Sequence, residues 1–168
     1  MSTPGQASRA DIFLDVQTKR MGKIKGEVTT EGHVDEIALC GWAWGAQAGD
    51  SVGYAARTAK RQYGPVVVTK SLDAASVPLL NVLATNDEVK QATLSMRKAG
   101  GAAVDYYTLK LGGARITDIG YGVDDQGSSV ERVSFSFTRF DVEYQGQDAD
   151  GTGRAGIAFS DEVIPSDD

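Results

Sequence analysis

The chain has 168 residues and a formal net charge of −6 at neutral pH. This length fits a single domain, residues 1–168, that can bury its own core. The net charge argues against a nucleic-acid partner, because binding phosphates requires a basic face. The N-terminus has no apolar signal segment and no stretch is long enough to cross a bilayer, so neither Sec-type export nor membrane insertion is expected.

The charges are spread unevenly along the chain. Residues 1–70 carry nine Lys and Arg against seven Asp and Glu, whereas residues 71–168 carry eight against sixteen. The stretch from Ser51 to Leu72 contains four basic residues and no acid. Such a stretch is either a solvated loop or a contact surface for an acidic partner.

Alternation of apolar residues predicts a mainly β fold from the start of the chain. Ile12, Leu14 and Val16 share one face of a strand, and residues 24–28 can pair with it after a turn near Gly22. In the next strand, residues 36–45, the apolar positions change parity. We therefore predict a bulge or bend at Cys40–Gly41, and we expect the single cysteine to be a buried, inert thiol.

One helix is predicted, over roughly 73–86, with Ser76 as its cap and Pro78 in its first turn. It follows a long loop, residues 46–65, of the length that is usually functional or partly disordered. Because the apolar stripe of one helix cannot form a core alone, the helix must pack on a sheet.

Strands are predicted on the C-terminal side of the helix as well. Residues 91–98 alternate, and 105–111 and 114–121 are expected to form a hairpin through Gly112–Gly113. The longest strand, 131–144, changes parity at Thr138–Arg139, which predicts a bend. A short strand near 157–159 follows, and residues 1–10 and about 160–168 are expected to be flexible termini.

These elements together predict an α+β fold that is mainly β: a small antiparallel β-barrel with one flanking α-helix. Curvature of the sheet would come from the two strands whose parity changes midway.

A search for catalytic or metal-binding residues finds no convincing site. The only histidine, His33, lies in a polar turn and is expected at the surface. One Cys and one His cannot fill a zinc site, and no GxSxG motif is present. The stretch 148–153 begins like a calcium loop but lacks the glutamate at its twelfth position. We therefore expect no enzyme activity, no metal and no cofactor.

Over about residues 11–153 the chain contains, in this order, the stretches DIFLDV, KIKGE, EIALCGWAWG, VTKSLDAASVPLL, ATLSMRKAGG and VSFSFTRFDVEYQGQDADG. Together, and in the same order, they resemble the haemolysin-coregulated protein (Hcp) family, which forms the inner tube of type VI secretion systems. The resemblance implies a structural subunit that assembles into hexameric rings, which stack head to tail into a tube inside a contractile sheath.

The resemblance also implies partners and location. The tube would carry a spike and small effector proteins, and would pass from the bacterial cytoplasm to the outside or into a target cell without a cleaved signal peptide. Two alternatives remain: a tail-tube protein of a phage-like injection particle, and a calcium- or sugar-binding β-sandwich.

The resemblance and the charge pattern assign candidate roles to three sets of residues. Candidates for ring stacking or contacts between subunits are Arg57, Lys60, Arg61, Tyr63, Asp124, Asp125, Asp148 and Asp150. Candidates for the tube lumen are Thr93, Ser95, Arg97, Ser134 and Ser136, although parity alone does not say which sheet face looks inward. The expected barrel framework is Trp42, Trp44, Phe135, Phe137, Phe140 and Tyr144.

Overall fold

The computed structural model describes residues 10–48, 61–98, 104–146 and 155–163. In these ranges the helix is α1 (Ser76–Ala84), somewhat shorter than the predicted span. The strands are β1 (Ala10–Thr18), β2 (Gly22–Ile24), β3 (Ile37–Leu39), β4 (Gly41–Ala43), β5 (Ala46–Gln47), β6 (Gln62–Tyr63), β7 (Val66–Lys70), β8 (Val89–Lys98), β9 (Asp105–Val123), β10 (Ser129–Ser136), β11 (Arg139–Tyr144) and β12 (Ile157–Glu162).

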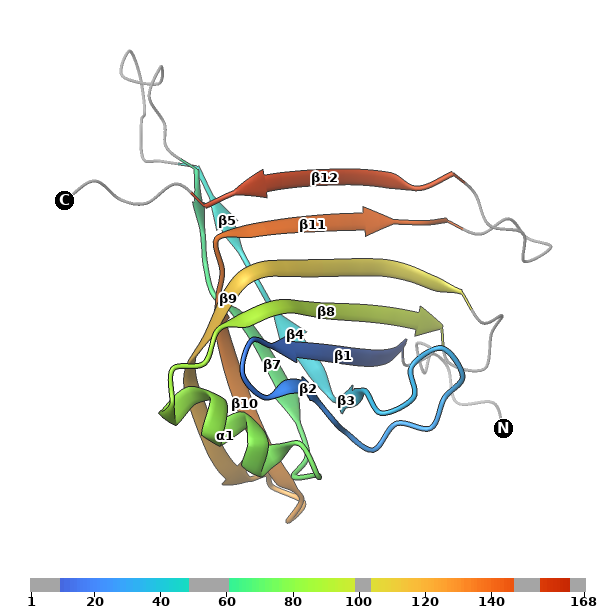
Figure 1. The fold of residues 1–168 in the computed structure, drawn as a ribbon. Helices are drawn as coiled ribbons and strands as arrows, with labels where there is room; N and C mark the ends of the chain where they lie inside the picture. Colours follow the sequence, from blue (N-terminus) through green and yellow to red (C-terminus); the bar gives the residue numbers. More distant parts are fainter. Residues whose placement is uncertain (1–9, 49–60, 99–103, 147–154, 164–168) are drawn as a thin grey trace, which may run out of the picture.

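The strands form two antiparallel layers that share β9 (Figure 1). The front sheet consists of β1, β8, the first part of β9, β11 and β12, with β2 and β3 paired to the other edge of β1. The rear sheet consists of the second part of β9 with β10, β7 and β4. The predicted mainly β fold is confirmed, but the hydrogen-bonded path runs openly from β2 to β4 and does not close into a barrel.

The long strand β9 bends where the sequence predicted a hairpin turn. Residues 105–112 pair with β8 or β11, and residues 115–123 pair with β10, so the chain does not reverse. Gly113 has a φ of +54°, a conformation that favours glycine. A Cβ atom at this position would also collide with Thr138 Oγ1. The predicted turn at Gly112–Gly113 is therefore wrong, because the glycines permit a bend between two sheets.

The predicted bend at Cys40–Gly41 is confirmed. β3 pairs with β1, β4 pairs with β7, and the Cys40 N–H donates to the Thr69 carbonyl at 2.7 Å. This short segment therefore links the front sheet, at β1, to the rear sheet, at β7. The Cys40 side chain is exposed, so the prediction of a buried thiol is wrong: the residue lies where the chain passes from one sheet to the other.

The core lies between the two sheets and is capped by α1. It includes buried side chains on both sides of the predicted parity change, namely Phe135, Phe137 and Phe140. They all point inward because β10 ends at Ser136 and β11 starts at Arg139, which confirms the bend. Tyr144, which was expected in the same framework, is 51% exposed and lies outside the core.

The helix α1 buries Leu79 and Val82 and packs against β9. Ser76 does not cap it, because the cap position is Ala75 and no side chain caps the end. The Ser76 hydroxyl instead donates to Glu131 Oε2 at 2.7 Å, inside the protein.

A buried ion pair joins the helix to the rear sheet. Lys70 on β7 and Glu131 on β10 are 0% exposed, and Lys70 Nζ lies 2.6 Å from Glu131 Oε2. The same ammonium group contacts Ser76 Oγ at 3.0 Å and Asp73 Oδ1 at 2.7 Å. Since Lys70 has three donors and finds three oxygen acceptors, its charge is compensated without water.

Replacing one partner of this pair is expected to be more harmful than replacing both. Glu131→Leu leaves a buried ammonium group without its main counter-charge and should cost about 3–5 kcal/mol of unfolding free energy. The double variant Lys70→Met/Glu131→Leu should recover most of this loss. Urea denaturation of the single and double variants measures the difference, and equal losses in both would contradict a compensated pair.

Candidate functional site

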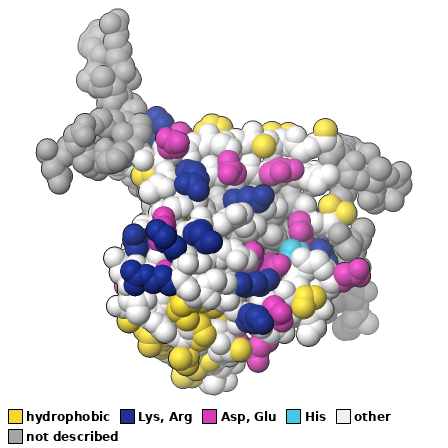
Figure 2. Space-filling view, in the orientation of Figure 1, with side chains coloured by type: hydrophobic (Ala, Val, Ile, Leu, Met, Phe, Trp, Pro, Cys, Tyr) yellow, Lys and Arg dark blue, Asp and Glu magenta, His cyan; other side chains and the backbone are white. Residues whose placement is uncertain are grey.

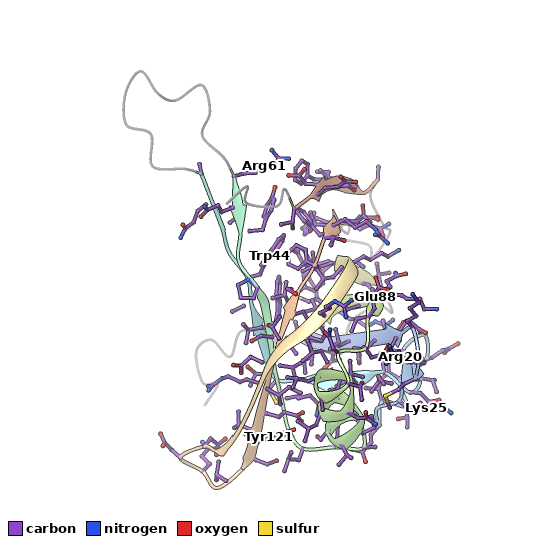
Figure 3. All side chains as sticks on the ribbon, turned by 60° about the vertical axis from the view of Figure 1, so that its left-hand side comes forward. Arg20, Lys25, Trp44, Arg61, Glu88 and Tyr121 are labelled. Atoms are coloured by element: carbon purple, nitrogen blue, oxygen red, sulfur yellow. The ribbon has the colours of Figure 1, made fainter. Side chains whose placement is uncertain are left out.

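A two-stranded arm, made of β5 and β6, extends from the body of the molecule (Figures 1 and 3). It belongs to the long loop that was predicted for residues 46–65. Two stacking candidates, Arg57 and Lys60, lie outside the described residues. The base of the arm is described, and it shows how the arm is held.

Trp44 anchors the arm to the core (Figure 3). Its indole N–H donates to the Gly64 carbonyl at 3.1 Å. Its ring packs edge to face on Phe140, with centroids 4.9 Å apart, and stacks with Tyr63 at 6.0 Å. The other tryptophan, Trp42, packs against Tyr107 and is partly buried. Both tryptophans are therefore partly buried and pack against the core.

A second anchor joins the arm to β12. Arg61 contacts Asp161 through Nε–Oδ2 at 2.5 Å and Nη2–Oδ1 at 2.9 Å. The Tyr63 hydroxyl donates to the same carboxylate. These hydrogen bonds, from Arg61 first and Tyr63 second, hold the pKa of Asp161 well below its usual range, and the bond to Asp161 raises the pKa of Tyr63. Arg61 and Tyr63, both predicted stacking residues, are thus engaged within their own chain.

Sequence reasoning missed Asp161. It sits in a short strand near the C-terminus, 100 residues away from Arg61, and no local pattern connects the two.

Next to this anchor, β11 and β12 present an apolar surface. Tyr144 pairs with Ile157 and Val142 with Phe159, and these residues share the side of the sheet on which Leu109 is buried. The two strands extend past the core, so Tyr144, Ile157 and Phe159 are 51%, 74% and 58% exposed. We call these three residues the β11–β12 apolar face.

The lumen candidates divide between two sheets. Thr93, Ser95 and Arg97 lie on the outer side of β8, whereas Ser134 and Ser136 lie on β10 in the rear sheet. Ser95 is buried, while Thr93 and Arg97 are partly buried. Part of the outer side of the front sheet is therefore covered by another segment of the chain.

That cover is the segment around His33, which is only 4% exposed. Its ring stacks on Phe13 with centroids 4.1 Å apart, and Phe13 pairs with Ser95. Nδ1 lies 3.0 Å from Glu36 Oε1 and Nε2 lies 2.9 Å from Asp105 Oδ1. The prediction of a surface histidine is wrong, because the polar turn folds back onto the sheet and both ring nitrogens meet carboxylates there.

The acidic stacking candidates are partly described. Asp124 accepts hydrogen bonds from the Gln126 and Ser128 amides in the β9–β10 turn, and Asp125 beside it is exposed. Asp148, Asp150 and the calcium-like stretch 148–153 lie outside the described residues. Within the part of the chain that is described, no cluster of three metal-ligating side chains occurs, and no helix has the length and apolar character needed to span a bilayer.

Comparison with known proteins places these features in a family. The family described as "Type VI secretion system effector, Hcp" matches residues 13–144, more than half of the chain. The curated relative "Protein hcp1" from Pseudomonas aeruginosa is 29% identical over 152 residues, which cover 87% of this chain and 90% of that protein.

Solved structures show the same fold. One described as a type six secretion system protein has a TM-score of 0.77 at 22% identity and covers 89% of this chain and 92% of its own. A type VI secretion system effector from Yersinia pestis has a TM-score of 0.72 at 22% identity and covers 91% of this chain and 100% of its own. These findings favour neither the phage-like tail protein nor the calcium- or sugar-binding sandwich. The chain belongs to the Hcp family, the tube proteins of type VI secretion systems.

Proposed function

We propose that this chain is a non-enzymatic subunit of a hexameric ring, and that the rings stack head to tail into a tube that a contractile sheath expels. A spike would cap the tube and small effectors would travel in its lumen. The protein would then pass from the bacterial cytoplasm to the outside or into a target cell without a cleaved signal peptide.

The observation that carries this proposal is the β11–β12 apolar face. It continues the core, since the Phe159 ring lies 5.9 Å from the ring of Phe140, yet in the single chain it is open to solvent. Exposed apolar patches of this kind mark interaction surfaces. Among the described strands β12 is also an edge strand, paired with β11 alone, and natural proteins usually cover such edges. A second copy of the chain would cover both the β11–β12 apolar face and the free edge of β12.

A different apolar surface lies at the other end of the molecule, over α1 and the β9–β10 hairpin (Figure 2). It contains the exposed side chains of Val77, Leu80, Tyr121 and Val123. Two unlike apolar surfaces at opposite ends suit a head-to-tail contact, which closes into a ring when the rotation between copies permits it.

The arm is suited to a contact between rings. Trp44 and the Arg61–Asp161 pair fix its base, so it can reach a neighbour without first being ordered. We keep Arg57, Lys60, Asp124, Asp125, Asp148 and Asp150 as candidates for the contact between rings. Arg61 and Tyr63 instead hold the arm in place.

Charges placed on the β11–β12 apolar face should prevent ring assembly. In Ile157→Asp/Phe159→Asp, two carboxylates would have to be buried in the contact, which should weaken it by about 2 kcal/mol or more, roughly 30-fold. Light scattering coupled to gel filtration should show the mass fall from that of a ring to that of a single chain.

Val34→Asp provides a control, because Val34 is also an exposed apolar residue but lies between β2 and β3, which pair with β1 and not with β11 or β12. This control should form rings as the wild type does. Normal rings in the double variant, with its fold intact by circular dichroism, would rule out the β11–β12 apolar face as the ring contact.

Removing the charge of Asp161 should loosen the arm. Asp161→Asn weakens the contacts to Arg61 and Tyr63, so amide hydrogen exchange should become faster in β5 and β6 and stay unchanged in β8. Asp141→Asn is the control, since Asp141 accepts a hydrogen bond from Ser160 on the other side of the same strands.

The same loosening is expected in the wild type at low pH. Because the folded-state pKa of Asp161 is lowered, its contribution is present above the ordinary carboxyl pKa of about 4 and is lost as the pH falls below it. If the protection factors of the amides in the arm change neither with pH nor with the substitution, the aromatic contacts of Trp44 hold the arm alone.

A further inference from the structure

A cationic hollow lies on the outer side of the front sheet, where β8, β9 and β11 run side by side. It has a volume of about 280 Å³, and its basic side chains are Lys90, Lys110 and Arg139. Gln91 and Asp141 also line it. Figure 2 shows Lys and Arg side chains gathered over this part of the molecule. The chain as a whole is acidic, so this concentration of positive charge is a local feature.

The backbone directs these side chains to one place. On β8, Gln91 pairs with Gln17 and Val89 pairs with Thr18, so Lys90 is an extra residue between two adjacent positions of β1. This is a β-bulge, which turns Lys90 outward together with Gln91. Bulges often serve to re-aim a side chain near a functional surface.

Gly112 makes room for the third cation. It pairs with Arg139 on β11 and with Gln91 on β8, so the three residues form one row across the sheet. A Cβ atom at Gly112 would lie 2.5 Å from Arg139 Nε and 2.6 Å from Cζ. The guanidinium group therefore lies directly over the glycine backbone, and a larger residue there would displace it.

The three cations of the hollow outnumber its one acid, Asp141. Among the described residues, none of Lys90, Lys110 and Arg139 forms an ion pair. The acid in the hollow, Asp141, accepts a hydrogen bond from Ser160. Elsewhere on the same sheet the charges are matched, as in the pair Lys23–Asp15 at 3.8 Å. The hollow is thus left with a positive charge that is available to a ligand.

We propose that this hollow binds carboxylate side chains of an acidic polypeptide. Arg139 offers a planar group with several donors for a carboxylate, and Lys90 and Lys110 add point charges on either side. The identification of this polypeptide as cargo of the tube rests on the proposed function, whereas the binding itself does not. In a ring the hollow would be repeated in every subunit, so weak single contacts would add up along one extended segment.

The lining favours a polypeptide over a nucleic acid. Asp141 lies inside the hollow, and Glu143 and Glu162 are exposed on the same two strands, so the positive charge is interrupted and does not form the continuous basic track that a phosphate backbone requires. The hollow has no aromatic side chain on which a base could stack. Gln91 and Asp141 can instead bond to the hydroxyl and amide groups of a peptide.

The proposal is tested with a fluorescent peptide of about twenty residues, rich in glutamate and serine, titrated with the full chain at low salt. The variant Lys90→Glu/Lys110→Glu/Arg139→Glu should bind it at least tenfold more weakly. The control Lys25→Glu/Lys98→Glu/Arg132→Glu has the same change in charge at exposed positions elsewhere. Its affinity for the peptide should fall less than threefold. Binding by the wild type should disappear near 1 M salt, where screening extends to about 3 Å.

Three results would overturn the proposal. The wild type could fail to bind the peptide, the two triple variants could lose affinity equally, or single-stranded DNA could bind more tightly than the peptide at the same salt. A milder variant, Lys110→Gln/Arg139→Gln, should show an intermediate loss and guards against misfolding of the triple variant.

Particle mass, measured in parallel, separates this proposal from the ring. Rings in the hollow variant that no longer bind the peptide would support both proposals. If the wild type binds the peptide but stays a single chain, the result would support peptide binding at the hollow and not the ring. If the wild type forms rings that do not bind the peptide, the result would overturn peptide binding at the hollow and leave the ring proposal standing.

Discussion

The bend in β9 is the constraint on which the other features depend. Gly113 takes a left-handed conformation, and Thr138 occupies the space that a side chain at this position would need. Through this bend one strand serves both sheets, and β8, β10 and β11 all take their positions from it. The front sheet consequently continues past the core, which leaves β11 and β12 without cover in the single chain. The same turn of the backbone sets Gly112 beneath Arg139 and so shapes the cationic hollow.

Much of this fold could be predicted from side-chain parity. A strand must keep its large residues inside, so the parity changes at Cys40–Gly41 and Thr138–Arg139 required bends, and the structure has them. The glycine pair in β9 was misread because glycine permits both a hairpin turn and a bend. Only the partners of the flanking residues, which lie on β8, β10 and β11, distinguish the two.

The candidate site was less predictable, because its contacts join residues that are distant in the sequence. Asp161 meets the arm across 100 residues, and His33 meets Asp105 across 72. A polar turn such as the one around His33 has the composition of a solvated loop, and local composition does not show that it folds over Phe13. Charge counting also pointed to the basic loop, yet Arg61 is matched by Asp161. The unmatched cations lie on strands, where alternation makes a charged residue look like ordinary solvent-facing surface.

The exposed position of Cys40 has a practical consequence. It is the only cysteine in the chain, and it lies where the strand passes from the front sheet to the rear sheet. A thiol-reactive dye would therefore attach once per subunit with no engineering of the sequence. Stepwise photobleaching of a labelled particle would count its protomers directly. Energy transfer between dyes on adjacent protomers would report the distance between their Cys40 residues.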